Sequence, residues 1–413
     1  MLQGRNLFRP RLEALEAREV PAVLQVNPAV ATDFHTIQSA INAAQPGDKI
    51  DVAHASYQED VIIDKSVSLI GQPDPVLHQN PFIVGAGGAG GLEAVVRVAD
   101  QVNNVVIENF AIGNGEGEQQ EQLGVLIGTG AGNVNLNHDV IRKVRNPLVA
   151  IAGPAVTDGI LIEQGAHNVS ISDLALYQIH DPTGSQGRAV GIVIDGANQV
   201  SINHTYVKNV DDLGILVRGS ATGVGLLGIG VEAILSMSGI GIAIENSAQV
   251  ALEHAKVYQL AGNSIGLLVE GSAQVNGTNC QLSENAYGVQ VAPDFTGSLT
   301  LRHSNIDGNT KAGIDNFAML AVNAPDDWWG DASGPAPHGL GNAVVGLVNV
   351  PSWLTTPAVK ATGSIAAWIS CPAATPAAMK IMGDWIVKHT SAIRRAMMGR
   401  PDEFPGSPRD RAA

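Results

Sequence analysis

This 413-residue sequence contains a short motif that repeats along the chain, and a charged residue follows the motif in several of its copies. Each follows a glycine and a short aliphatic run, and the set comprises Glu163, Asp195, Arg218, Glu245 and Glu270. If successive phrases stack as neighbouring strands, residues at equal positions lie about 5 Å apart. Two carboxylates at that separation suit a retaining glycosidase, and those on alternate strands approach the separation of an inverting one. Glu163, Asp195 and Arg218 are therefore a candidate catalytic set for a polysaccharide lyase or hydrolase.

The same row also has a structural interpretation. Arg218 stands between Asp195 and Glu245 in the repeat, so its charge can compensate both carboxylates in a solvated ladder. Both interpretations remain open at the level of sequence.

Long loops precede the glycine phrase in the first three repeats, at 113–122, 142–158 and 180–188, and they shrink in later repeats. Long loops on a rigid stack often carry function, so these are expected to wall one groove. His180 lies on its rim, and the substrate-binding candidates on or beside the rim are Asp181, Arg188, Lys208, Asp211, Asp212 and Glu245. Alternatively, the loops serve only to cover the outward-facing apolar residues of the glycine strands and keep them out of water.

A second polar position recurs four residues after the leading Val or Leu of each repeat, and it is occupied by Asn109, His138, Asp173, His204, Gly228, His254, Asn279 and His303. Four histidines suggest metal ligands, but His138 and His204 are two repeats apart, roughly 9.6 Å in a stacked sheet. One zinc ion needs ligand atoms within about 4 Å of each other. Asn, Asp, His and Gly instead share a tolerance for left-handed backbone. We expect tight corners here, and no metal site.

The elements that position these residues are short strands in a repeat of 24 to 35 residues. The leading residues are Val105, Val134, Val169, Val200, Val224, Val250, Val275 and Leu299, and each is followed by a glycine phrase. The fourth repeat shows three strands, at 200–202, about 206–208 and 214–217. Such turns bury apolar residues only by stacking on their neighbours, which predicts an all-β parallel solenoid.

Residues 31–357 resemble a right-handed parallel β-helix of the pectin-lyase-like superfamily. The stretch "FHTIQSAINAAQPGDKIDVAHASYQEDVIIDKSVSLIG" is similar to its opening coil, with a capping helix at 37–44 begun by Thr36 or Asp33. "DDWWGDASGP" is similar to a closing phrase of bacterial β-helix proteins, in which Trp328 and Trp329 would plug the core.

The resemblance implies that an enzyme would work on the outer face of the glycine strand. There the outward residues are mostly apolar: Leu126, Leu161, Val193, Leu216, Ala243, Leu268 and Gln290. "SYQED" is similar to part of a pectin methylesterase motif, and Asp211-Asp212 to half of a polygalacturonase pattern, but no catalytic set is complete. A calcium cofactor is implied only if the protein is a lyase.

Composition excludes some partners. The net charge of −15 provides no basic surface for a nucleic acid. Cys280 and Cys371 are too few for a disulfide framework. The apolar stretch 223–244 contains Glu232 and six glycines and fits the repeat, so we do not expect a transmembrane segment.

The two ends differ from the repeat. Residues 1–30 are expected to be an arm, and "LEALEAREVPA" resembles an export leader of budding bacteria. Residues 358–413 are expected to contain one amphipathic helix, starting at Thr375-Pro376, and a disordered tail. Its apolar stripe comprises Ala378, Met382, Trp385, Ile386, Ile393 and Met397.

These observations favour a non-catalytic extracellular or cell-surface scaffold, adhesion protein or polysaccharide-binding surface. The alternative is a polysaccharide lyase or glycoside hydrolase acting in a groove of coils two to four. The oligomeric state is left open.

Overall fold

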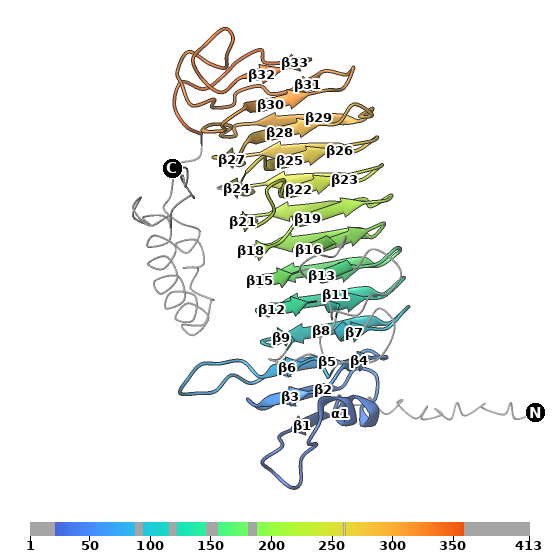
Figure 1. The fold of residues 1–413 in the computed structure, drawn as a ribbon. Coiled ribbons are helices and arrows are strands. Elements are labelled where there is room, and N and C mark those ends of the chain that lie inside the picture. Colours follow the sequence, from blue (N-terminus) through green and yellow to red (C-terminus); the bar gives the residue numbers. More distant parts are fainter. Residues whose placement is uncertain are drawn as a thin grey trace, which may run out of the picture.

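A computed structural model describes residues 21–86, 94–114, 122–145, 156–180, 188–258, 260 and 262–358. Its strands form three parallel sheets, and most turns of the chain contribute one strand to each sheet (Figure 1). The predicted parallel solenoid is confirmed. The expected C-terminal helix lies outside the described residues, as does the rest of the segment after residue 358.

Sheet A has 13 strands in the described ranges: β1 (Val23–Val26), β2 (Lys49–Val52), β5 (Ser68–Gly71), β8 (Asn103–Glu108), β11 (Gly132–Asn137), β14 (His167–Ser172), β17 (Asn198–Asn203), β20 (Val224–Leu227), β23 (Gln249–Glu253), β26 (Gln274–Thr278), β29 (Ser298–Arg302), β31 (Val322–Asn323) and β33 (Val348–Asn349). Residues 23–26, placed in the N-terminal arm from sequence, thus pair in parallel with β2.

Sheet B has nine strands in the same ranges: β3 (Ser56–Gln58), β6 (Phe82–Val84), β9 (Ala111–Gly113), β12 (Val140–Arg145), β15 (Ala175–His180), β18 (Tyr206–Val210), β21 (Gly230–Ile234), β24 (Lys256–Tyr258) and β27 (Gln281–Ser283). Sheet C, which contains the glycine phrases, has eleven: β4 (Val61–Ile63), β7 (Ala94–Val98), β10 (Leu123–Ile127), β13 (Val156–Ile162), β16 (Arg188–Asp195), β19 (Leu213–Arg218), β22 (Ile240–Ile244), β25 (Ile265–Val269), β28 (Tyr287–Val291), β30 (Ala312–Asn316) and β32 (Val344–Val345). The apolar stretch 223–244 forms β20, β21 and β22, as its place in the repeat predicts.

The recurring polar position is a left-handed corner between sheets A and B. All eight residues expected there have φ between 46° and 63°, from His204 at 46° to Asn109 at 63°. Left-handed backbone is costly for most side chains, but less so for Asn, Asp and His and not for Gly. This corner prediction is confirmed.

The glycine of the phrase is required by close packing between coils. A Cβ on Gly191 would lie 2.4 Å from the carbonyl oxygen of Gly214, and one on Gly214 would lie 2.5 Å from that of Gly241. Neighbouring backbones therefore approach too closely for any side chain at this position. The repeated Gly is a packing requirement of the stack.

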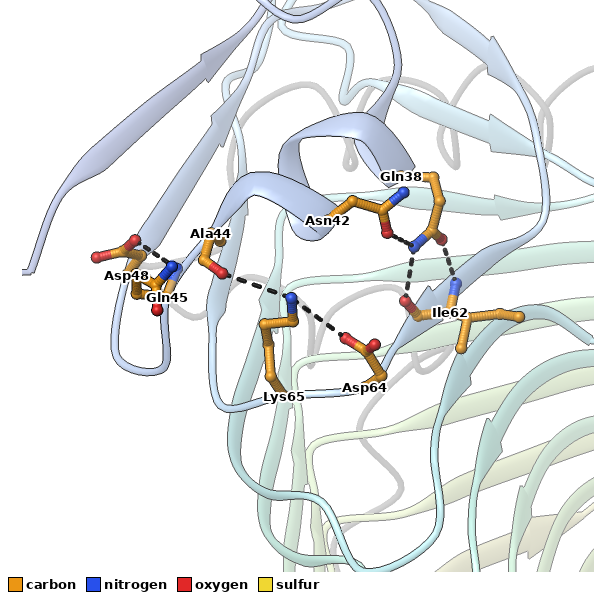
Figure 2. Close-up of polar contacts among 8 residues, drawn as sticks. All are labelled: Gln38, Asn42, Ala44, Gln45, Asp48, Ile62, Asp64 and Lys65. Carbon is orange, nitrogen blue, oxygen red and sulfur yellow. Dashed lines mark hydrogen bonds and ion pairs between the residues drawn. The ribbon is translucent and has the colours of Figure 1, made fainter.

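The helix α1 (Ile37–Ala43) lies at the N-terminal end of the stack (Figure 1). Thr36 is its N-cap, accepting a hydrogen bond from the Ser39 N–H, and Ile37 and Ile41 are fully buried. Figure 2 shows how the helix covers the end strand of sheet C: the Gln38 side chain accepts from the Ile62 N–H at 2.7 Å and donates to the Ile62 carbonyl at 3.1 Å. Those backbone groups belong to β4, the edge strand, so the helix satisfies an otherwise open edge.

Trp329 is fully buried in the core near the other end, while Trp328 is only partly buried. The inward residues of sheet C, such as Ile160, Ile192 and Ile215, are fully buried in the same core. Their predicted orientation is confirmed.

Candidate functional site

The charged row (Glu163, Asp195, Arg218, Glu245 and Glu270) lies in one register along sheet C. Asp195 pairs directly with Arg218. Glu163 follows Ile162, which pairs with Ile194, and Glu245 follows Ile244, which pairs with Val217. The alignment of the row is therefore as the repeat predicts.

Three members of the row already have partners. The Asp195 carboxylate accepts from Arg218 Nη2 at 2.7 Å and from Nε at 2.9 Å. Glu163 Oε2 accepts from both the backbone N–H and the hydroxyl of Thr129, each at 3.0 Å. Thr129 belongs to the preceding coil and Arg218 to the following one, so the two carboxylates are engaged in opposite directions along the stack.

At the end of the row, no ion pair is found for Glu245 or Glu270 among the residues that the structure describes. Burial raises the pKa of Glu270, and the nearby charges of Glu245 and Asp294 raise it further. Like charges at adjacent positions disfavour ionisation, so Glu270 holds its proton to a higher pH than an isolated glutamate.

The rim candidates occupy several places. Arg188 begins β16 and is exposed. Asp212 Oδ2 accepts from the Ala189 N–H at 2.9 Å, and Asp211 Oδ1 lies 2.8 Å from His180 Nδ1. Lys208 points from the outer face of sheet B. Asp181 lies outside the described residues.

The outward row of sheet C is buried at four of its seven positions, and Leu161, Leu268 and Gln290 are partly exposed. Leu216, Ala243 and Val193 are between 0% and 3% exposed and form a cluster separate from the core. This burial favours covering of the row over an accessible apolar groove.

A buried acid that the sequence did not single out lies in the same sheet. Asp158 in β13 is 2% exposed, and no hydrogen-bond partner is found for its Oδ1 among the described contacts. Burial raises the pKa of Asp158 to about 7, while the charges of Arg188 and Arg218 act to lower it. A carboxyl that titrates near neutrality suits general acid–base chemistry.

A second polar arrangement, the sheet B stripe, runs over five successive coils. Strand pairing places one residue from each of β12, β15, β18, β21 and β24 side by side on the outer face. Its residues are all partly exposed, and they are Arg142, Tyr177, Lys208, Glu232 and Tyr258.

Glu232 is the centre of this stripe. It accepts hydrogen bonds from Lys208, from Tyr206 and, at 2.8 Å, from the Tyr258 hydroxyl. Burial raises the pKa of Glu232, but the Lys208 charge and the hydrogen bonds from Lys208, Tyr206 and Tyr258 outweigh this and lower it. Burial and the Glu232 charge raise the pKa of Tyr206, so its hydroxyl remains a donor. Lys208, Glu232 and Tyr258 of the stripe therefore form a preorganised network around an ionised carboxylate.

A left-handed residue lies in each of four sheet B strands that carry the stripe, β12, β15, β18 and β21. Lys143, Gln178, Asn209 and Ala233 have φ between 52° and 62° and are skipped in the strand pairing. A residue in this conformation interrupts the regular alternation of inward and outward side chains along the strand. As a result, Ile141 and Val144 both point into the core while Arg142 between them points outward.

Apart from Lys208, sequence reasoning missed the stripe, although a signal exists. Each member stands four residues after a corner residue, as Lys208 follows His204 and Glu232 follows Gly228. The residue types at this offset differ from coil to coil, so no repeated letter marks the position.

Two of the corner histidines lie beside an aspartate. The Asp173 carboxylate lies between His138 and His204, with each nitrogen–oxygen distance 3.9 Å. Within the described ranges, no three His, Cys, Asp or Glu side chains are grouped so as to hold a metal ion. No helix in these ranges is long and apolar enough to cross a membrane.

Comparisons with known proteins agree with the fold. Residues 158–319 match the family model described as a right handed beta helix region. Two solved A-modules of mannuronan C-5 epimerases from Azotobacter vinelandii, AlgE4 and AlgE6, superpose with TM-scores of 0.58 and 0.54. Each is 14% identical to this chain, with 78% of this chain and 94% of the module covered. A search of curated protein sequences returned no match. The chain thus has a right-handed parallel β-helix fold.

Proposed function

We propose that this β-helix binds a polysaccharide along the sheet B stripe and does not cleave it. The observation that carries the proposal is the stripe itself, in which Arg142, Tyr177, Lys208, Glu232 and Tyr258 share one register on five coils. The stripe runs along the stack axis, which is the direction an extended polymer would follow.

The chemistry of the stripe suits a sugar polymer. Its tyrosine hydroxyls, ammonium, guanidinium and carboxylate groups can bond to sugar hydroxyls and acidic groups. The Arg142 guanidinium already lies over the Phe82 ring, 4.7 Å from its centroid, which fixes its position. Partial exposure leaves these groups within reach of a ligand, while the Glu232 network limits the ordering that binding would require.

The absence of cleavage is inferred from the charged row. Asp195 is held by Arg218 and Glu163 by Thr129, so neither is held ready as a free base or nucleophile. The two epimerase modules of the same fold are named for mannuronan, which supports a polymeric carbohydrate as the ligand class. A role outside the cell, at the bacterial surface, follows from such a ligand.

One observation favours a second candidate, a polysaccharide lyase or hydrolase acting at sheet C. Asp158 is buried, its pKa is raised by burial to about 7, and Arg188 and Arg218 act on it electrostatically. If the protein cleaves polymers, Asp158 is the group we expect to exchange the proton.

Retention on immobilised alginate, pectate and a neutral β-glucan tests the proposal, with new reducing and unsaturated ends measured in the same samples. The wild type should be retained on at least one polymer without producing new ends. Combining Arg142→Gln with Tyr177→Ala should weaken retention by about tenfold or more. The matched control is Lys311→Gln with Tyr287→Ala, because Lys311 likewise lies over an aromatic ring, 5.0 Å from its centroid, but on sheet C.

If the variant with Arg142→Gln and Tyr177→Ala is retained as well as the wild type, the polymer does not bind at the sheet B stripe. New ends that disappear in Asp158→Asn would instead establish the catalytic alternative.

A further inference from the structure

The C-terminal end of the stack exposes an apolar surface. The end patch consists of residues from the turn after β30 and from the last strands of the stack: Phe317, Met319, Leu320, Val345 and Leu347. Met319 is 89% exposed, and Phe317 and Leu347 are each more than half exposed. A cluster of exposed, large apolar side chains is typical of an interaction surface.

Hydrogen bonds hold the two parts of the patch together. The Asn316 side-chain amide donates to the Leu320 carbonyl at 2.8 Å and to the Leu347 carbonyl at 2.7 Å. The Val322 N–H also donates to the Leu347 carbonyl. The patch is therefore a fixed surface, supported by the core residues behind it.

The strands at this end are edges. Within the described residues, β32 ends sheet C and β33 ends sheet A, so each pairs on one side only. Val344 and Val348 pack on the core but are only partly buried. At the opposite end, α1 buries Ile37 and Ile41 and covers the edge strand β4 (Figure 2). Among the described residues, a helix therefore covers the edge strand of sheet C at the N-terminal end, whereas β32, the edge strand of the same sheet at the C-terminal end, has no helix over it.

We propose that residues 375–399 of the same chain dock on the end patch as an amphipathic helix. The chain leaves the described part at Ala358, whose N–H donates to Asn305 near this end. The 17 residues from there to Thr375 (375 − 358) span up to about 55 Å when extended, which is ample to cross the end of the stack.

Residues 375–399 have the apolar spacing and the charge that docking on the end patch requires. The apolar residues of this segment recur at helical spacing, with Met382, Trp385 and Ile386 on one stripe that Ile393 and Met397 continue. Its basic residues, which include Lys388, Arg394 and Arg395, are attracted electrostatically to a chain whose net charge is −15. Attachment to the same chain gives the segment a high effective concentration at the patch, which a second copy lacks.

Hydrogen exchange of the full-length chain tests this docking. Amides of 378–397 should exchange at least about tenfold more slowly than in an unstructured peptide. Combining Phe317→Glu with Leu347→Glu should abolish this protection without unfolding the stack, because both side chains are already exposed. Val76→Glu with Met237→Glu is the matched control, since both residues are about as exposed or more so but lie elsewhere.

Three results would overturn the proposal. The first is fast exchange of 378–397 in the wild type. The second is protection that persists in the end-patch variant, which would place the segment elsewhere. The third is protection that rises with protein concentration together with a dimeric mass by light scattering, which would assign the patch to a second copy.

Discussion

At the scale of the residue, backbone conformation explains the pattern that first suggests chemistry. His204, His254 and His303 occupy corners with φ near 50°, where a branched side chain would clash with its own backbone. Their recurrence reflects the geometry of the turn rather than a ligand set.

The first prediction concerns this corner. His204→Val should lower the free energy of unfolding by about 1–2 kcal/mol, because a left-handed conformation costs that much for an ordinary residue and more for a β-branched one. His204→Asn should be close to neutral. Denaturant unfolding measures both variants, and equal loss of stability in the two would contradict the backbone explanation.

Buried acids are the second feature at this scale. Asp327 is fully buried, its Oδ1 accepts from the Ser304 N–H at 2.7 Å, and no partner is found for its Oδ2 within the described contacts. Burial raises the pKa of Asp327 from 3.8 to about 7. The folded protein therefore keeps a proton there at pH values where the unfolded chain has lost it.

The second prediction follows from that difference. Between about pH 4 and pH 7, the Asp327 contribution to stability should fall as pH rises, by up to roughly 1.4 kcal/mol per pH unit. Asp327→Asn keeps the acceptor and removes the titration, so its unfolding free energy should fall less between pH 4.5 and pH 7.5. Asp331→Asn is the control, because hydrogen bonds from Ser333 lower the pKa of Asp331 and its effect lies at lower pH. An unchanged pH profile for Asp327→Asn would refute the assignment.

At the scale of the element, two polar rows lie on different sheets and differ in exposure. The Arg218 and Asp195 side chains are 40% and 37% exposed, whereas Lys208 and Glu232 are 21% and 14% exposed. Solvent screens the first pair, and the second is bound into a tyrosine network.

The third prediction separates these rows. Arg218→Ala should cost less than about 1 kcal/mol of unfolding free energy, as is usual for an exposed ion pair. Lys208→Met should cost roughly 3 kcal/mol, because it leaves the mostly buried Glu232 carboxylate without its cation. Lys208→Met with Glu232→Gln should recover much of that loss. Equal effects of the two single substitutions would show that burial does not distinguish the rows.

The repeat in the sequence predicted most of the strand register. Strand register follows from the Val and Gly phrases, which is why the alignment of Glu163, Asp195 and Arg218 was predictable. The partner of Glu163 was not, because Thr129 lies in a turn outside both phrases. The sheet B stripe was not predicted because left-handed residues such as Lys143 and Asn209 change which side chains of a strand face outward.

At the scale of the whole molecule, stacking supplies both rigidity and a long surface. One continuous core extends from Val26 to Trp329, and each coil buries its apolar residues against its neighbours. A surface feature repeated on successive coils therefore becomes a straight row along the axis, as the sheet B stripe does. A row of this kind matches an extended polymer better than a small molecule, which would need a concave pocket.

The most direct test is a hydrogen-exchange footprint of the protein with a bound oligosaccharide taken from the retained polymer. If the protein binds without cleavage at the stripe, added protection should fall on β12, β15, β18, β21 and β24, and the oligosaccharide should remain intact. Protection that falls instead on β13, β16 and β19, together with shortened oligosaccharide, would contradict this account and assign the activity to the sheet C face around Asp158.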